Sequence, residues 1–150
     1  MNDYDPEKFI NCALDVEREY LLKDKSLSSD SFKWFLTGDS QDKMDQIIKK
    51  YPTKAFSTNK YQLGHIGEQN VGYHRTILDV ELLSKCDELI VTGGSTYGWI
   101  AAMKMLKLPL YIEGKNLTTI TMNKCVRSRF SEPPSCGPNS ALPFSRNSVF

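Results

Sequence analysis

A glycine-rich turn between a predicted strand and a predicted helix constrains the fold of this chain more than any other segment. Residues 88–91 form a short apolar run, residues 92–98 read Thr-Gly-Gly-Ser-Thr-Tyr-Gly, and residues 99–106 have a helix-forming composition. Such a junction directs free backbone N–H groups and two hydroxyls toward one point. Since phosphate oxygens bind at points of this kind, the segment predicts a local structure and a candidate anion site together.

The rest of the chain alternates between helical and strand patterns. Apolar spacing and strand composition predict helices near residues 6–23, 44–48 and 74–85, and strands near residues 32–37, 54–57 and 108–112. This alternation predicts an α/β fold with a parallel sheet and helices on both of its faces. In such folds, ligands bind beyond the carboxyl ends of the strands.

Composition excludes several classes of function. The net charge is +1, without a long basic or acidic block, so we expect no nucleic-acid partner. No apolar stretch reaches the roughly 18 residues that a membrane span needs, and the polar, acidic start does not have the pattern of a signal peptide. The four cysteines lack the C-x-x-C spacing of zinc sites, so we expect no metal.

Two features would have consequences only in the secretory lumen. Asn116-Leu117-Thr118 is a sequon, which accepts a glycan only in that compartment. Cys125 and Cys136, the two cysteines that lie close in sequence, form the candidate disulfide, and a disulfide would persist in the same compartment.

The glycine-rich turn contains the first candidate binding residues. Ser95 or Thr96 is positioned to be the N-cap of the following helix, and the preceding glycines allow the backbone to approach an anion closely. The start of a helix carries about half a positive charge on its exposed N–H groups, which would stabilise a diphosphate. The alternative is that the hydroxyls only cap the helix and the glycines only form a turn.

Two acidic residues are candidates for contacts with a nucleotide. Asp79 lies in an otherwise apolar helical stretch, and its carboxylate could accept two hydrogen bonds from the adjacent N1–H and N2 amine of guanine. The alternative is a solvated acid on the helix face. Asp39, directly after a predicted strand, could bind a ribose hydroxyl or could cap the next helix.

Residues 79–98 resemble the donor-site segment of α1,2-fucosyltransferases. The plant xyloglucan type has a similar Leu-Leu-Ser stretch followed by Ser-Thr-Phe-Gly. The animal galactoside type has an acidic residue in the equivalent helix and a similar turn followed by Trp and two Ala, as in residues 99–102 here. The α1,6-fucosyltransferases are similar around residues 78–84. Residues 125–134 also resemble the plant family's Cys-x-Arg and Glu-Pro-Cys segment, although Pro134 replaces its cysteine.

The resemblance implies a Rossmann-like parallel sheet that forms the donor-side lobe of a GT-B glycosyltransferase. It implies an inverting, metal-independent transfer of fucose from GDP-fucose to the 2-hydroxyl of a galactose-terminated glycan in the Golgi. Asp79 would hold guanine. The diphosphate would be held by the side chains and backbone of the turn, namely Gly94, Ser95, Thr96, Tyr97 and Gly98.

The resemblance also sets the expected organisation of the chain. Residues 1–30 would form an N-terminal helix and loop, residues 31–124 the Rossmann-like GDP-sugar-binding domain, and residues 125–150 an irregular Pro- and Ser-rich tail. We find no equivalent of the family's His-x-Arg motif, its acceptor lobe or its membrane anchor, so we expect the donor-side part of such an enzyme. The alternatives are a non-catalytic nucleotide- or phosphate-binding α/β module, a degenerate copy, and a purely structural domain.

Overall fold

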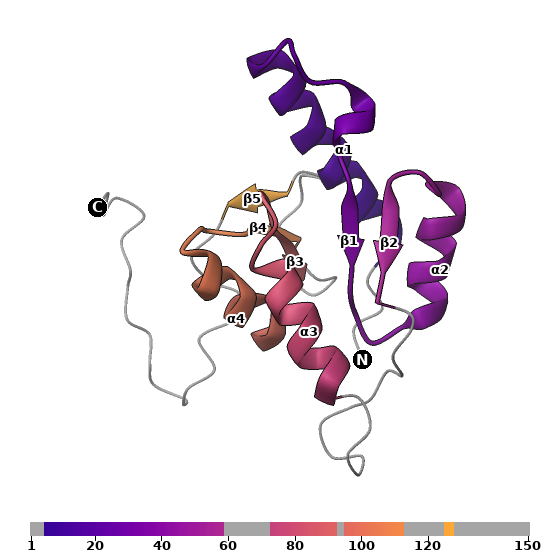
Figure 1. Ribbon diagram of the computed structural model, residues 1–150, viewed down its shortest axis with the longest axis vertical. Helices are drawn as coiled ribbons and strands as arrows, with labels where there is room; N and C mark the ends of the chain where they lie inside the picture. The colour runs from indigo at the N-terminus through magenta and orange to yellow at the C-terminus, as the bar shows by residue number, and fades with distance from the viewer. Residues whose placement is uncertain (1–4, 59–72, 93–94, 113–124, 128–150) are drawn as a thin grey trace, which may run out of the picture.

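The computed structural model describes residues 5–58, 73–92, 95–112 and 125–127. Helices and strands alternate over most of this range (Figure 1). The elements are α1 (Pro6–Lys23), η1 (Ser29–Ser31), β1 (Trp34–Leu36), α2 (Gln41–Lys50), β2 (Ala55–Ser57), α3 (Tyr73–Leu83), β3 (Ile90–Thr92), α4 (Thr96–Met105), β4 (Leu110–Ile112) and β5 (Val126–Arg127). The predicted α/β class is therefore confirmed, although the described strands form two small sheets in place of the single parallel sheet that was expected. None of the described helices is both long and apolar enough to cross a membrane.

The strands form two small sheets, and each contains a parallel pair joined through a helix. β1 pairs with β2 from Trp34↔Ala55 onward, with α2 as the connection. β3 pairs with β4 from Ile90↔Leu110 onward, with α4 as the connection. Two β-α-β units result, and within each pair the carboxyl ends of the strands lie at the same edge.

Strand β5 differs from the prediction of an irregular tail. Residues 126–127 pair antiparallel with β4, and Tyr111 lies opposite Val126. Two residues alone give almost no strand signal in a sequence. They form a strand here because the edge of β4 supplies the hydrogen-bonding partners. Pairing with a distant strand therefore decides the conformation of this segment.

Helix α1 packs against both sheets. Its Ile10 lies in a cluster with Ile47 of α2 and Ala55 of β2. Its Cys12 lies in a second cluster with Leu110 and Ile112 of β4. Asp5 caps the helix by accepting a hydrogen bond from the backbone of the first turn, and a proline in that turn favours the same start. This cap fixes where α1 begins relative to both clusters.

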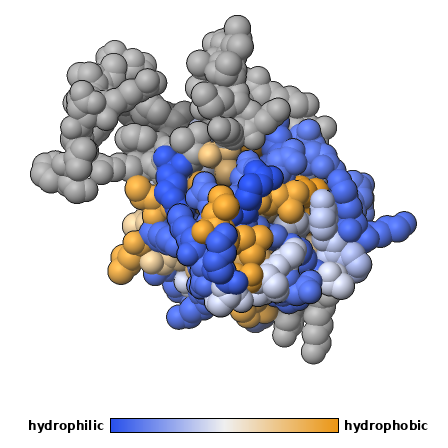
Figure 2. Space-filling view, turned by 90° about the horizontal axis from the view of Figure 1, so that it is seen from above, coloured by the Kyte–Doolittle hydropathy of each residue, from blue (hydrophilic) through white to orange (hydrophobic). Residues whose placement is uncertain are grey.

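The third cluster holds α3 and α4 together against β3. It contains Leu83, Val91, Ala101 and Ala102, and Phe35 of β1 packs against it. Figure 1 shows α3 and α4 next to each other beside β3, whereas α2 lies beside β2. In Figure 2, hydrophobic residues on the face seen from above form separate patches between hydrophilic ones.

A disulfide joins Cys12 of α1 to Cys125, and the Cα atoms are 5.6 Å apart. The expected pairing of Cys125 with Cys136 is therefore wrong, and Cys136 itself lies outside the described residues. The pairing of β5 with β4 brings Cys125 to the face of the sheet that α1 covers. The fold brings together two cysteines that are 113 residues apart, so closeness in sequence did not predict the pairing.

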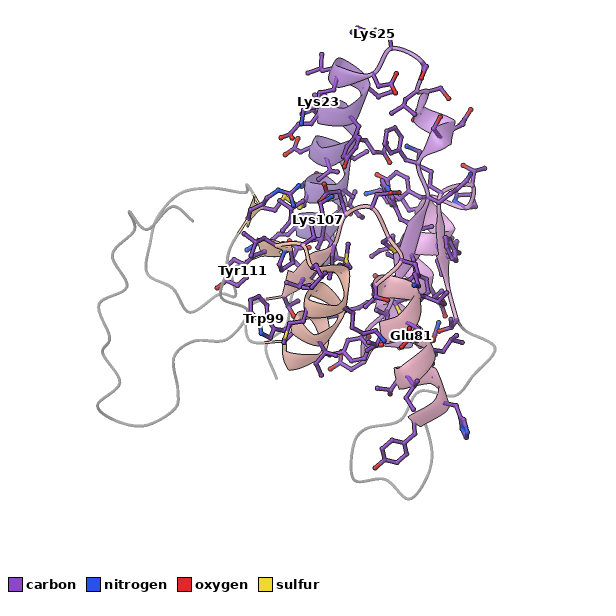
Figure 3. All side chains as sticks on the ribbon, turned by 60° about the vertical axis from the view of Figure 1, so that its left-hand side comes forward. Lys23, Lys25, Glu81, Trp99, Lys107 and Tyr111 are labelled. Carbon is purple, nitrogen blue, oxygen red and sulfur yellow. A yellow bond between two sulfur atoms is a disulfide. The ribbon has the colours of Figure 1, made fainter. Side chains whose placement is uncertain are left out.

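Three charged residues and a tyrosine lie where β3 and β4 begin, and we name them the amino-edge cluster: Glu88, Tyr20, Lys107 and Arg127. Glu88 accepts hydrogen bonds from the Tyr20 hydroxyl at 2.9 Å, from Lys107 at 3.0 Å and from Arg127 at 2.8 Å. Arg127 contacts both carboxylate oxygens. Figure 3 shows Lys107 next to α1. These contacts join α1, β5 and the starts of both strands.

Candidate functional site

The turn between β3 and α4 has the predicted cap. Ser95 is the N-cap of α4, and its hydroxyl oxygen accepts a hydrogen bond from the Gly98 backbone N–H at 3.2 Å. The prediction of a Ser95 or Thr96 cap is thus confirmed for Ser95. The Ser95 hydroxyl proton is not used by this bond, so it could still be donated to an anion. Gly94 and the Thr96 side chain lie outside the described part of the chain.

Gly98 allows α4 to pack closely on β3. A Cβ atom at this position would lie 2.6 Å from Cγ1 and 2.9 Å from Cβ of Val91. Real Cβ atoms do not approach side-chain carbons this closely, so a larger residue would push the helix away from the strand. The glycine therefore serves the packing that fixes where the helix start lies.

Asp79 lies inside the protein, with 2% of its surface exposed. Its Oδ2 accepts a hydrogen bond from the Thr37 hydroxyl at 2.7 Å, and its Oδ1 accepts one from the Thr58 hydroxyl. Thr37 directly follows β1, and Thr58 directly follows β2. The alternative of a solvated acid on the helix face is therefore wrong. Asp79 instead connects α3 to the carboxyl ends of two parallel strands.

A buried cation accompanies this carboxylate. Arg75, with 3% of its surface exposed, lies one helical turn before Asp79, and its Nε is 3.5 Å from Asp79 Oδ2. Its NH1 donates to the Gln41 side-chain oxygen at 3.0 Å, at the first residue of α2. Burial of a charge is tolerated where an opposite charge and hydrogen bonds compensate it. Arg75 meets this condition at the start of α2.

Tyr97 links the glycine-rich turn to the same residues. Its hydroxyl donates to the Thr76 carbonyl at 3.2 Å and lies 3.5 Å from the Thr37 hydroxyl. Burial is the main reason that the pKa of Tyr97 is raised to about 12. The phenol is therefore neutral at physiological pH. The helix that starts at the turn is thus fastened to α3 and adjoins the end of β1.

We name this group the carboxyl-edge cluster. It contains one acid, one base, one amide and three hydroxyl groups, contributed by α2, α3, α4 and the ends of β1 and β2: Asp79, Arg75, Gln41, Thr37, Thr58 and Tyr97. The acid and the base balance each other, and the remaining groups are neutral. The arrangement is suited to recognition by directed hydrogen bonds.

Asp39 lies apart from the cluster contacts. It is exposed, and the N-cap of α2 is the next residue, Ser40. The prediction that Asp39 caps this helix is therefore wrong, while its role with a ribose hydroxyl stays a prediction. An exposed carboxylate one residue before a helix start remains free to accept from a ligand hydroxyl.

Several members of the cluster were missed from the sequence. Thr37 and Thr58 each occupy the first position after a strand, and Arg75 lies four residues before Asp79. Polar residues directly after parallel strands are a usable signal, because those positions converge at one edge. The spacing of four residues is another, since it places a base and an acid on the same face of a helix.

Comparisons of the chain with protein-family models, with curated proteins and with solved structures found no match. The geometry of the carboxyl edge and the sequence resemblance are therefore the basis for the function proposed below.

Proposed function

We propose that this chain carries the donor-binding part of an α1,2-fucosyltransferase. In this proposal the complete enzyme transfers fucose from GDP-fucose to the 2-hydroxyl of a galactose residue on a glycan, with inversion. One observation carries the proposal beyond the resemblance. The capped turn before α4 and the buried Asp79 adjoin at the carboxyl edge, where the Tyr97 hydroxyl lies 3.5 Å from the Thr37 hydroxyl that donates to Asp79. A nucleotide and its diphosphate need two such recognition points close to each other.

The start of α4 would hold the diphosphate. The helix presents backbone N–H groups there, with about half a positive charge, and the Ser95 and Thr96 hydroxyls add donors. Negative charge builds on the β-phosphate as the bond between fucose and phosphate breaks. Fixed donors directed at that charge stabilise the transition state, usually the largest electrostatic contribution of an active site. This chemistry needs no metal for charge stabilisation.

Asp79 would set the acceptor character that makes the site selective for guanine. Its two carboxylate oxygens receive two hydroxyl donors, from Thr37 and Thr58. Guanine offers a matching pair of donors in N1–H and the N2 amine, whereas adenine offers no such pair. The acceptor character of this part of the carboxyl edge supports a guanine nucleotide over an adenine nucleotide. Asp39 would contact the ribose.

The proposal places the complete enzyme in the Golgi lumen, as a GT-B protein with a separate acceptor lobe. The disulfide between Cys12 and Cys125 supports an oxidising compartment, where such bonds persist. The Asn116 sequon provides the test, because we expect it to be glycosylated when the full protein is expressed in a eukaryotic cell. Secreted material with an unmodified Asn116 would contradict the localisation.

Calorimetric titration of the purified chain with GDP, GDP-fucose and ADP tests the donor site. We expect GDP and GDP-fucose to bind and ADP to bind at least tenfold more weakly, roughly the loss expected when one charge-assisted hydrogen bond is missing. Ser95→Ala should weaken GDP binding, with circular dichroism as the control for folding. A folded chain that binds none of these nucleotides would contradict the proposal and favour a structural domain. Selective binding without transfer by the complete protein would favour the non-catalytic module.

A further inference from the structure

Asp79 is too deeply buried to be the surface that a ligand meets first. Thr37 and Thr58, the residues that donate to it, are only partly buried and lie at the ends of two neighbouring parallel strands. We propose that these two threonine hydroxyls are the specificity-determining groups of the site and that they contact the base in place of Asp79. This inference rests on the proposed function, because it names the residues that select the nucleotide.

The hydrogen-bonding capacity of a hydroxyl explains how the threonines would act. A hydroxyl has one proton to donate and two lone pairs to accept with. Thr37 and Thr58 both use that proton on the Asp79 carboxylate. A hydroxyl that donates to a carboxylate is polarised and becomes a stronger acceptor. Toward a ligand, each threonine therefore presents acceptors only.

The two threonines follow neighbouring strands and bond to the same carboxylate, so a ligand with two donors could contact both of them. β1 and β2 pair in register, Leu36 opposite Ser57, so the residues that follow them lie at equivalent positions along the sheet edge. One Thr37 lone pair faces the Tyr97 hydroxyl at 3.5 Å, and Tyr97 gives its own proton to a backbone carbonyl. The threonine oxygens at this edge thus act as acceptors toward a ligand, because Asp79 takes their protons.

The chemical class that matches is a purine with a ring N–H next to an exocyclic amine. Guanine has both groups. Hypoxanthine keeps the ring N–H but lacks the amine, and adenine presents an acceptor where guanine has N1–H. A site built to hydrogen-bond a donor rejects the analogue that lacks it, because its own polar groups are left unmatched. The threonines therefore predict the order GDP, then IDP, then ADP.

The experiment is calorimetric titration of the chain with GDP, IDP and ADP, for the wild type and for Thr37→Val and Thr58→Val. Valine keeps the branched shape and removes only the hydroxyl. We expect each variant to bind GDP about tenfold more weakly, the loss usual for one hydrogen bond to a polarised group, with ADP binding unchanged. Thr37→Ser and Thr58→Ser should restore the GDP preference. Thr53→Val, at an exposed position between α2 and β2, is the matched control and should change nothing.

The outcomes separate this inference from the proposed function. Suppose that the wild type and both valine variants prefer GDP over ADP equally, while Asp79→Asn has no preference. Asp79 would then contact the base directly, and this result would overturn the inference alone. Equal wild-type affinities for GDP and IDP would also overturn it, and this comparison needs no variant to fold. A folded wild type that binds no nucleotide would overturn the proposed function and the inference with it.

Discussion

The carboxyl-edge cluster and the amino-edge cluster are both built around one carboxylate, but they differ in burial and in the kind of partner. Asp79 is 2% exposed and is held by two hydroxyls and a buried arginine. The Glu88 side chain is 12% exposed, and its partners Lys107 and Arg127 are 43% and 44% exposed. Water screens the charges of the second cluster much more than those of the first.

The elements that the two clusters join differ as well. The amino-edge cluster ties α1 to β5 through Tyr20 and Arg127, and the disulfide from Cys12 to Cys125 ties the same two parts of the chain. The carboxyl-edge cluster has no covalent support within the described residues, and it lies where parallel strands end. At the amino edge, the contacts of Glu88 join the same two parts of the chain as the disulfide does. At the other edge, two neutral hydroxyls and a buried guanidinium surround a buried acid.

Asp79→Ala should have the largest effect on stability. It removes the acceptor of both threonine hydroxyls and the carboxylate that pairs with the buried Arg75 guanidinium. Breaking a buried ion pair from one side costs about 3–5 kcal/mol. Urea unfolding monitored by circular dichroism measures the difference. A loss equal to that of Asp87→Ala, an exposed aspartate, would show that the cluster is weaker than its burial implies.

Removal of the disulfide should have the next largest effect. Cys12→Ser opens a bond between residues 113 positions apart, and loss of a native disulfide typically costs about 2–5 kcal/mol. Cys86→Ser is the matched control, because Cys86 is a free thiol. Urea unfolding of both variants under non-oxidising and oxidising conditions gives the comparison. If dithiothreitol destabilised Cys12→Ser as much as the wild type, the disulfide would not be the link that matters.

Glu88→Gln should cost less, about 1 kcal/mol, because its two cationic partners are more than one-third exposed. The disulfide also keeps α1 and β5 together when the charge is lost. In a Cys12→Ser background, the same substitution should therefore cost more, since the two links share the same elements. Strict additivity of the two substitutions in urea unfolding would contradict the idea that the cluster supports the disulfide.

The pH dependence of the Glu88 contribution follows from its pKa. Burial raises the pKa of Glu88, but hydrogen bonds from Lys107, Arg127 and Tyr20 outweigh burial and hold it below its ordinary value. A lowered pKa gives a contribution that is present above the unfolded value and is lost as the pH falls through the folded value. The difference between wild type and Glu88→Gln should thus disappear in acid. If the wild type and Glu88→Gln still differed in stability in acid, the charge of Glu88 would not be the cause of the difference.

The two edges also show which parts of the molecule could be predicted from the sequence. The Ser95 cap and the alternation of elements depend on residues near each other in the chain, so local patterns identified them. The partners of Asp79 lie 21 and 42 residues before it and meet it only because β1 and β2 pair. Cys125 finds Cys12 across a still longer interval. These contacts arise from the pairing of strands, and local patterns in a single sequence do not show which strands pair.

Tyr97→Phe should have an effect of the same order as Glu88→Gln and sharpen the comparison at alkaline pH. It removes one neutral hydrogen bond, to the Thr76 carbonyl, which is worth about 0.5–1.5 kcal/mol. Burial raises the pKa of Tyr97 to about 12, so the contribution of the phenol is fully present below the unfolded pKa of about 10 and is lost as the pH rises through the folded value.

The tyrosine of the other edge provides the reference for this last measurement. The hydrogen bond to Glu88 and partial burial raise the pKa of Tyr20, but its partner is an acid that water reaches. Tyrosinate absorbance of the wild type, of Tyr97→Phe and of Tyr20→Phe should show that Tyr97 titrates at a higher pH than Tyr20. If Tyr20 titrated after Tyr97, the hydrogen bond to Glu88 would raise a tyrosine pKa more than the burial of Tyr97 does, contrary to the contrast between the two edges.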